Sequence, residues 1–299
     1  MRIGLTAQMH GRRDQGRPPP SWEFLRELAL TAEKVGFDSF VFEDALLYRT
    51  DDLTEGCWEA VSVAGALAAV TERIEIGPSV FNAPYRSPAM LAKIAATLDE
   101  IAGGRLMFGL GAGNAFDSDY EAFGFSLDHR YSRFEEAIQI IHPLLKEGKV
   151  DFEGKHYFAR RSELHPRGPR AGGPPINIAA GSPKMTRLTA RYADAWNWWN
   201  MGIEGSLDAL RPTVKELERA CEEEGRDPAT LRRTVDVYSF DTDGSSGEDQ
   251  AMTGSAETFA EAVLSYRELG FDEVRVDLYP KNVAAVEWFA PVVELVHEG

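Results

Sequence analysis

Cysteine is scarce in this chain of 299 residues, which contains only Cys57 and Cys221. The two thiols lie far apart and form no CxxC spacing, so the sequence predicts neither a disulfide framework nor a zinc site. The first residues lack the basic region, apolar core and cleavage site of a signal peptide, and no apolar run approaches the roughly 20 residues that span a membrane. We therefore expect a cytoplasmic protein that has no membrane partner.

The chain also contains fewer basic than acidic residues. Lysine and arginine number 32 against 48 aspartates and glutamates, which gives a formal net charge of −16. A nucleic-acid groove requires a basic stripe that neutralises phosphates, so this balance excludes a nucleic-acid partner. A small phosphorylated cofactor stays possible, because a few backbone N–H groups and one lysine can hold a single phosphate. The expected partners are small molecules.

What the chain does contain is a regular alternation of strand-like and helix-like segments, with 43% hydrophobic and 27% charged residues. The strand-like runs are Arg2–Ala7, Ser39–Glu43, Ile74–Phe81, Leu106–Leu110, Ile176–Ala180, Ala195–Trp199, Thr234–Phe240 and Glu273–Leu278. The runs with apolar residues at helical spacing are Trp22–Val35, Cys57–Val70, Ala89–Ile101, Arg133–Lys146, Lys184–Tyr192, Leu207–Glu224, Ala256–Leu269 and Val283–Val296. Such an alternation predicts parallel crossovers and a closed sheet, so we expect a (β/α)8 TIM barrel in a single domain of residues 1–299.

One segment departs from the alternation. Residues 150–161 have the pattern of a hairpin that turns at Glu153-Gly154, and a stretch rich in proline and glycine follows them. We therefore expect a hairpin insertion outside the barrel at about residues 150–174.

The informative residues of a barrel are those that follow its strands. His10 follows the first strand and is a candidate acid or base, although a solvated loop histidine fits equally well. Asp44 follows the second strand, where it could orient a polar edge of a cofactor ring or cap its own turn. Glycine, alanine, serine and asparagine end the next four strands, which disfavours the His and carboxylate ligands of a metal-dependent hydrolase.

The most specific passages end the third strand and form the fourth. They read GPSVFNAPYRSP at residues 77–88 and GRLMFGLGAGN at residues 104–114. In this order they resemble the bacterial-luciferase-like flavin oxidoreductases, especially the branch that uses the 5-deazaflavin coenzyme F420, typified by methylenetetrahydromethanopterin reductase. The resemblance implies a luciferase-like barrel with a non-prolyl cis peptide between Ser79 and Val80. It further implies that the cofactor ring packs against this bulge, next to Asn82.

The resemblance implies two further cofactor contacts. The loop after the fourth strand would approach the ring, and its residues are Gly111, Ala112, Gly113 and Asn114. The loop after the fifth strand holds the cofactor phosphate in relatives, and its residues here are Ala179, Ala180, Gly181 and Ser182. Free N–H groups at a helix start suit a phosphate. A serine N-cap followed by proline at N1 accounts for the same residues without any ligand.

Residues 128–136, DHRYSRFEE, resemble the family's entry into its fourth helix. His129 is a second candidate for proton transfer. The helical spacing of Arg130, Arg133 and Glu136 predicts an ion-pair network.

Two positions depart from the sugar-phosphate dehydrogenase branch of the family. Ala45 stands where that branch has an active-site histidine, and Asn114 stands where it has a catalytic glutamate, so that activity is not expected. The leading hypothesis is an F420-dependent oxidoreductase that transfers a hydride to or from a small organic substrate. The alternatives are a monooxygenase that uses reduced FMN and a non-catalytic flavin-binding protein. Barrels of this family are often dimers, so we expect a homodimer.

Overall fold

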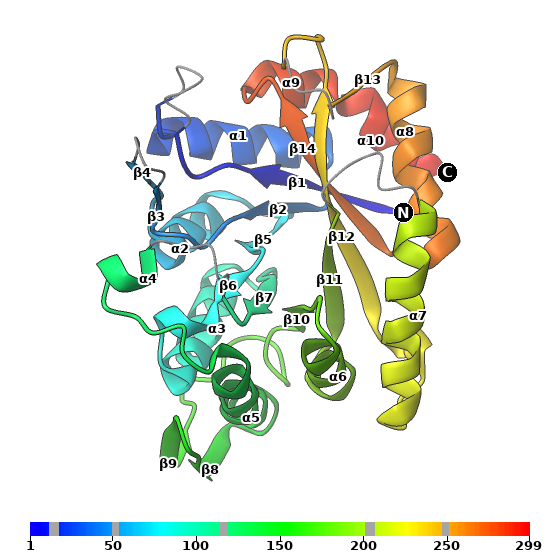
Figure 1. Cartoon of the computed structure of the whole chain (residues 1–299). Coiled ribbons are helices and arrows are strands. Elements are labelled where there is room, and N and C mark those ends of the chain that lie inside the picture. Colours follow the sequence, from blue (N-terminus) through cyan, green and yellow to red (C-terminus); the bar gives the residue numbers. More distant parts are fainter. Residues whose placement is uncertain (12–17, 50–53, 114–118, 201–206, 247–250) are drawn as a thin grey trace.

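The computed structural model describes residues 1–11, 18–49, 54–113, 119–200, 207–246 and 251–299. A parallel sheet surrounded by helices forms the body of the molecule (Figure 1). Its main strands are β1 (Arg2–Ala7), β2 (Ser39–Phe42), β5 (Glu75–Pro78), β6 (Phe81–Asn82), β7 (Phe108–Gly111), β10 (Ile176–Ala179), β11 (Ala195–Asn200), β12 (Arg232–Asp241) and β14 (Glu273–Tyr279). They are hydrogen-bonded in the order β5-β2-β1-β14-β12-β11-β10-β7-β6.

The third strand expected from the sequence is divided into β5 and β6 by Ser79 and Val80. β5 pairs with β2, whereas β6 pairs with β7. Because both segments belong to one stretch of backbone, the sheet closes on itself. Ile76 reinforces the closure, since its N–H donates to Arg105 O at 3.1 Å and its carbonyl accepts from Met107 N at 3.0 Å. The predicted (β/α)8 barrel is confirmed, with its third strand interrupted.

Helices follow the strands and cover the outside of the barrel. They are α1 (Trp22–Val35), α2 (Ala60–Val70), α3 (Pro88–Ile101), α4 (Asp119–Ala122), α5 (Arg130–Glu147), α6 (Pro183–Tyr192), α7 (Leu207–Glu223), α8 (Ala256–Ser265), α9 (Val283–Trp288) and α10 (Ala290–Glu298). The sequence predicted one helix over residues 283–296, but the structure divides it at Phe289. Pro291 lies in the first turn of α10 and has no N–H with which to continue the α9 ladder.

Two antiparallel hairpins lie outside the barrel. The first, β3 (Leu47–Arg49) with β4 (Thr54–Gly56), is at the left edge of Figure 1 and was not anticipated. The second, β8 (Lys149–Glu153) with β9 (Phe158–Glu163), is at the bottom.

Glu136 on α5 forms hydrogen bonds with the turn between β8 and β9. Its carboxylate accepts the backbone N–H groups of Lys155, His156 and Tyr157 at 2.8 to 2.9 Å. The expected ion-pair network of Glu136 with Arg130 and Arg133 is therefore wrong, because the carboxylate is used by the hairpin amides.

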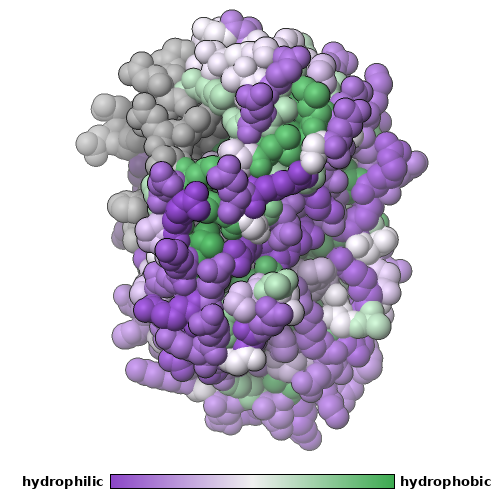
Figure 2. Space-filling model, turned by 90° about the vertical axis from the view of Figure 1, so that its right-hand side faces the viewer, coloured by the Kyte–Doolittle hydropathy of each residue, from purple (hydrophilic) through white to green (hydrophobic). Residues whose placement is uncertain are grey.

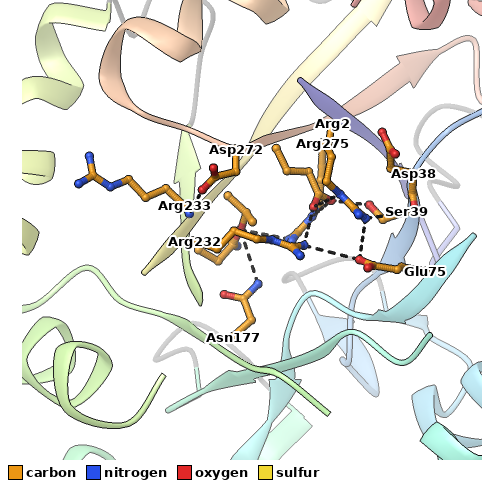
Figure 3. A network of polar contacts seen from close by, with 12 residues as sticks. Arg2, Asp38, Ser39, Glu75, Asn177, Arg232, Arg233, Asp272 and Arg275 are labelled. Carbon is orange, nitrogen blue, oxygen red and sulfur yellow. Dashed lines mark hydrogen bonds and ion pairs between the residues drawn. The ribbon is translucent and has the colours of Figure 1, made fainter. Parts of the chain in front are cut away.

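The amino end of the barrel interior contains buried charges. Glu273 and Arg275 on β14 are fully buried and form an ion pair of 3.0 Å. Arg232 and Arg2 contact Glu273 Oε2 at 2.8 and 3.4 Å, and Ser39 donates to Oε1 at 2.6 Å (Figure 3). Burial opposes ionisation of Glu273, but the three guanidinium groups and the Ser39 hydroxyl outweigh it and lower its pKa to about 2. The network keeps a buried carboxylate charged.

The surface over α7 and α8 is predominantly hydrophilic, with scattered apolar patches (Figure 2). This agrees with the large negative net charge of the chain. Among the described residues, no helix combines the length and apolar character that crossing a membrane requires.

Candidate active site

A cavity of about 730 Å³ opens at the carboxyl ends of the barrel strands. We call it the mouth cavity. Of the residues predicted from the sequence, those that line it are His10, Asp44, Ser79, Val80, Asn82, Gly111, Ala112, Gly113 and Ala179. These positions come from the loops after four different strands and from the interrupted third strand. The closed barrel therefore brings most of the predicted site together.

Val80 lies at the interruption of the third strand and lines the mouth cavity. The peptide bond between Ser79 and Val80 is cis, as predicted. A Cβ at Gly111 would lie 2.7 Å from Val80 Cγ2. A Cβ at Gly109 would lie 2.8 Å from Val80 Cγ1 and 2.8 Å from Pro78 O. Gly109 and Gly111 of β7 therefore leave the space that the Val80 side chain occupies.

Ser79 joins a polar network in the floor of the mouth cavity. Its hydroxyl donates to Asp236 Oδ2 at 3.0 Å and accepts from Arg275 Nη1 at 3.0 Å. Asn197 Nδ2 donates to the same Asp236 oxygen at 2.7 Å, and its Oδ1 accepts from Thr234 at 2.6 Å. This network fixes the side chains that face the cavity from three strands. It also connects the cavity floor to the buried charges below it.

The sequence interpretation missed Asp236 and Asn197, although both line the mouth cavity. Each lies within a strand, where alternate side chains face the barrel interior. A polar residue at such a position was the signal that could have identified them.

Asp44 is fully buried in its side chain and forms two hydrogen bonds with Arg86, of 2.5 and 3.1 Å. It also accepts the backbone N–H of Asn82 at 2.9 Å. Burial raises the pKa of the Asp44 carboxyl, and the Arg86 guanidinium and the Asn82 amide oppose that rise. Asp44 thus anchors the loop after β6. Asn82 in turn accepts a hydrogen bond from the Tyr120 hydroxyl at 2.7 Å.

His10 lies beside Glu43 at the edge of the mouth cavity. Its Nδ1 is 2.7 Å from Glu43 Oε1, and the ring of Tyr48 packs edge-on at 4.6 Å between centroids. The same Glu43 oxygen accepts the backbone N–H of Met9 at 2.8 Å and lies 3.8 Å from Cys57 Sγ. With Glu43 ionised, Nδ1 carries the donated proton, so Nε2 is the nitrogen that can accept another. The pair has the arrangement of an oriented acid–base group.

His129 does not line the mouth cavity. It is the N-cap residue of α5, with a positive φ of 59°, and it lines a neighbouring groove of about 520 Å³. The other residues that line this basic groove are Leu127, Arg130, Tyr131, Ser132 and Lys184. Arg130 also lines the mouth cavity, so the two spaces adjoin.

The loop after β10 lies at the start of α6. Ala180 is buried, and its carbonyl accepts from Trp196 Nε1 at 3.1 Å. Ser182 is the N-cap of α6, and its hydroxyl accepts from Met185 N at 3.5 Å. The capping interpretation of Ser182 is therefore confirmed, while a phosphate contact at Gly181 or Ser182 stays a prediction. Asn114 lies outside the described residues.

A sequence profile described as luciferase-like monooxygenase matches residues 1–245 of this chain. Among curated proteins, the F420-dependent glucose-6-phosphate dehydrogenase of Amycolatopsis mediterranei (strain U-32) is 31% identical over 228 residues, which are 73% of this chain and 66% of that protein. The matched region thus spans slightly less than two thirds of that relative.

Solved structures share the fold at low sequence identity. An F420-dependent secondary alcohol dehydrogenase in complex with an F420-acetone adduct superposes with a TM-score of 0.82 at 19% identity, covering 99% of this chain and 98% of the other. A riboflavin lyase with modified FMN and riboflavin gives a TM-score of 0.80 at 15% identity, covering 98% and 91%. The same barrel therefore serves more than one flavin-type cofactor.

Proposed function

The chain belongs to the luciferase-like monooxygenase family, and on that premise we propose that it is an F420-dependent oxidoreductase. The reaction is hydride transfer to or from a small organic substrate. The observation that carries the proposal is the mouth cavity, which gathers eight of the twelve positions predicted to contact the cofactor. Relatives that are named F420-dependent add independent support.

The mouth cavity fits a planar ring attached to an anionic tail. Val80, Ala112 and Ala179 offer small apolar surfaces against which a ring can pack. The basic groove adjoins the cavity through Arg130 and also contains Lys184, which pairs with Glu135 at 2.7 Å. A phosphate on the tail would meet the Arg130 guanidinium and would compete with Glu135 for Lys184. Lys184 lies in the first turn of α6, whose N-terminal N–H groups add further donors.

When bound, the deazaflavin ring supplies hydride chemistry at its C5 atom. The chain binds and orients the ring, and it moves the proton that accompanies the hydride. We assign that proton to Nε2 of His10. Glu43 holds His10 through Nδ1 and stabilises the imidazolium formed when Nε2 accepts a proton. Glu43 is thus a positioning residue.

The direct test is cofactor binding. Titration of the purified protein with F420 is expected to quench the F420 fluorescence, whereas FMN in a parallel titration is expected to give no saturable change. Binding of FMN alone would overturn the proposal in favour of a monooxygenase. Binding of F420 without turnover of any reductant or oxidant would favour a non-catalytic carrier.

The role of His10 is tested separately. His10→Asn is expected to lower kcat by roughly 10²- to 10⁴-fold with unchanged F420 affinity, because it removes acid–base catalysis only. Glu43→Gln is expected to shift the pH profile of kcat. An unchanged kcat in His10→Asn removes this residue from the mechanism. His129→Asn is then measured in the same assay, although His129 lines the neighbouring groove and not the mouth cavity.

The assembly and location of the protein belong to the same proposal. Family barrels are often dimers, so we propose a cytoplasmic homodimer built from one barrel domain per subunit. Light scattering coupled to size-exclusion chromatography measures its mass directly. A monomeric mass at micromolar concentration contradicts the dimer.

A further inference from the structure

Three side chains that can bind a metal ion meet at the edge of the mouth cavity. His10 Nδ1, Glu43 Oε1 and Cys57 Sγ all lie within 4.8 Å of one another. The histidine nitrogen is 2.7 Å and the cysteine sulfur 3.8 Å from the Glu43 oxygen. With bonds of about 2.0–2.3 Å, the nitrogen, oxygen and sulfur donors of a tetrahedral zinc site lie roughly 3.3–3.6 Å apart. Shifts of about 1 Å therefore allow these three atoms to surround such an ion.

Backbone contacts bring these three residues together from separate segments of the chain. His10 and Cys57 form an antiparallel β-bridge, and the Cys57 N–H donates to Leu46 O at 3.0 Å. Glu43 follows β2, and its Oε1 accepts the Met9 N–H at 2.8 Å. Hydrogen bonds of this kind orient the ligands of a metal ion. The fold therefore places all three donors before any ion binds.

The donor types and their exposure suit zinc. A thiolate and an imidazole favour zinc, whereas magnesium and calcium prefer oxygen ligands. The side chains of His10 and Glu43 are 18% and 22% exposed and line the mouth cavity, so an ion and a fourth ligand can reach them from that side. The sequence predicted no zinc site because its two cysteines lack CxxC spacing. That rule does not detect a site assembled from three segments.

We propose that Zn²⁺ binds to His10, Glu43 and Cys57 and thereby blocks the His10 acid–base group. The Cys57 thiol releases its proton to solvent, and the thiolate, the carboxylate and His10 Nδ1 each donate an electron pair to the ion. A neutral imidazole that binds a metal through Nδ1 carries its proton on Nε2. Nε2 can then no longer accept the proton that accompanies the hydride. The metal site is independent of the proposed function, whereas its effect on turnover rests on that function.

Metal binding is tested on the purified protein with Co²⁺ and Zn²⁺. Co²⁺ is expected to give the near-ultraviolet charge-transfer band of a cobalt–thiolate bond, and added Zn²⁺ is expected to remove it. Cys57→Ala should abolish the band and raise the calorimetric Kd for Zn²⁺ by more than about tenfold, since loss of an outer partner alone costs roughly 10- to 100-fold. Glu43→Gln keeps the thiolate and should raise the Kd without abolishing the band. Cys221→Ala is the matched control, because Cys221 is fully buried on α7, and it should keep both the band and the Kd.

The change in the protonated nitrogen of His10 is tested by NMR of protein that contains ¹⁵N-labelled histidine. Two-bond nitrogen–proton correlations distinguish an imidazole protonated on Nδ1 from one protonated on Nε2. Zn²⁺ is expected to move the His10 proton from Nδ1 to Nε2, and EDTA is expected to return it. His10→Asn identifies the signals of this residue.

Three results would overturn the metal site. They are a thiolate band that persists in Cys57→Ala, an equal loss of the band in Cys221→Ala, and binding of Mg²⁺ as tight as that of Zn²⁺. A His10 proton that stays on Nδ1 while Zn²⁺ is bound overturns the proposed effect on acid–base catalysis. If Zn²⁺ binds as expected while F420 does not bind, the cofactor assignment fails and the metal site stands.

Discussion

Replacing Gly111 with alanine should weaken cofactor binding through Val80. The new methyl carbon would lie 2.7 Å from Val80 Cγ2, whereas carbon atoms pack comfortably at about 3.5–4.0 Å. Val80 therefore has to move by roughly 1 Å to restore an ordinary contact. It is half-buried and lines the mouth cavity, so the available direction leads into the space proposed for the ring.

The size of the effect follows from the cost of overpacking, which is about 1–3 kcal/mol. Expressed as lost affinity, this raises Kd roughly 5- to 150-fold. Gly109→Ala provides the contrast. Its methyl carbon would lie 2.8 Å from the carbonyl oxygen of Pro78, and that oxygen cannot move unless β5 moves. The second variant should therefore lose folding stability rather than affinity alone.

The assay combines F420 titration with urea denaturation for both variants, each with and without Val80→Ala. Removing the two Cγ atoms leaves the Gly111 methyl without a clash, so Val80→Ala with Gly111→Ala should bind like Val80→Ala alone. The Gly109 variant should keep its stability loss in either background, because the Pro78 carbonyl persists. Unchanged affinity in Gly111→Ala, or a loss that Val80→Ala fails to cancel, would refute this reasoning.

Three further predictions concern stability. The pKa of Glu273 is lowered from its ordinary 4.5 to about 2, which corresponds to roughly 3 kcal/mol of folding free energy that is present above pH 4.5 and lost as the pH falls toward 2. Urea denaturation between pH 6 and 2.5 should show this loss, and Glu273→Gln should lack most of it. Asp44→Asn leaves the Arg86 guanidinium without its buried carboxylate and should cost about 3–5 kcal/mol in urea denaturation; a loss below 1 kcal/mol contradicts the anchoring role. Glu136→Ala should accelerate amide hydrogen exchange at residues 155–157 and leave exchange of the barrel amides unchanged. Equal exchange at residues 155–157 in both proteins would contradict the hydrogen bonds assigned to the Glu136 carboxylate.

The barrel could be predicted from the sequence because its signals are local and repeated. Each strand-like run is followed by a helical pattern, and turns such as the one at Gly36 occur where a strand must begin. Gly36 has the left-handed φ of 106° expected of such a turn. The sequence does not show the break of the last helix at Phe289 through its apolar spacing, which continues across it. The signal is Pro291, which has no N–H with which to continue the hydrogen-bond ladder.

The site could be predicted only in part. Residues that follow strands were identified because a barrel places them at one face, and this located His10 and Asp44. Val80 was identified from the resemblance of residues 77–88 to the luciferase-like family. The pairing of His10 with Glu43 joins residues from different strands, and their 2.7 Å distance depends on the register of β1 against β2. The cavity of about 380 Å³ beside β1 and β14 is lined by residues from both ends of the chain, and no local pattern indicates such a space.

The division of the third strand has a consequence for how this protein can change. β5 pairs with β2 and β6 pairs with β7, so the backbone that closes the barrel is the same backbone that places Val80 in the wall of the mouth cavity. Glycines lie on both sides of the interruption between β5 and β6. A Cβ at Gly77 would lie 2.1 Å from Met107 O, and a Cβ at Gly111 would lie 2.7 Å from Val80 Cγ2. Substitutions at these glycines would change both the pairing that closes the barrel and the wall of the mouth cavity. The cavity of about 380 Å³ beside β1 and β14 is lined in part by side chains of the covering helices, such as Phe24 and Val286, and these side chains can be exchanged without opening the barrel.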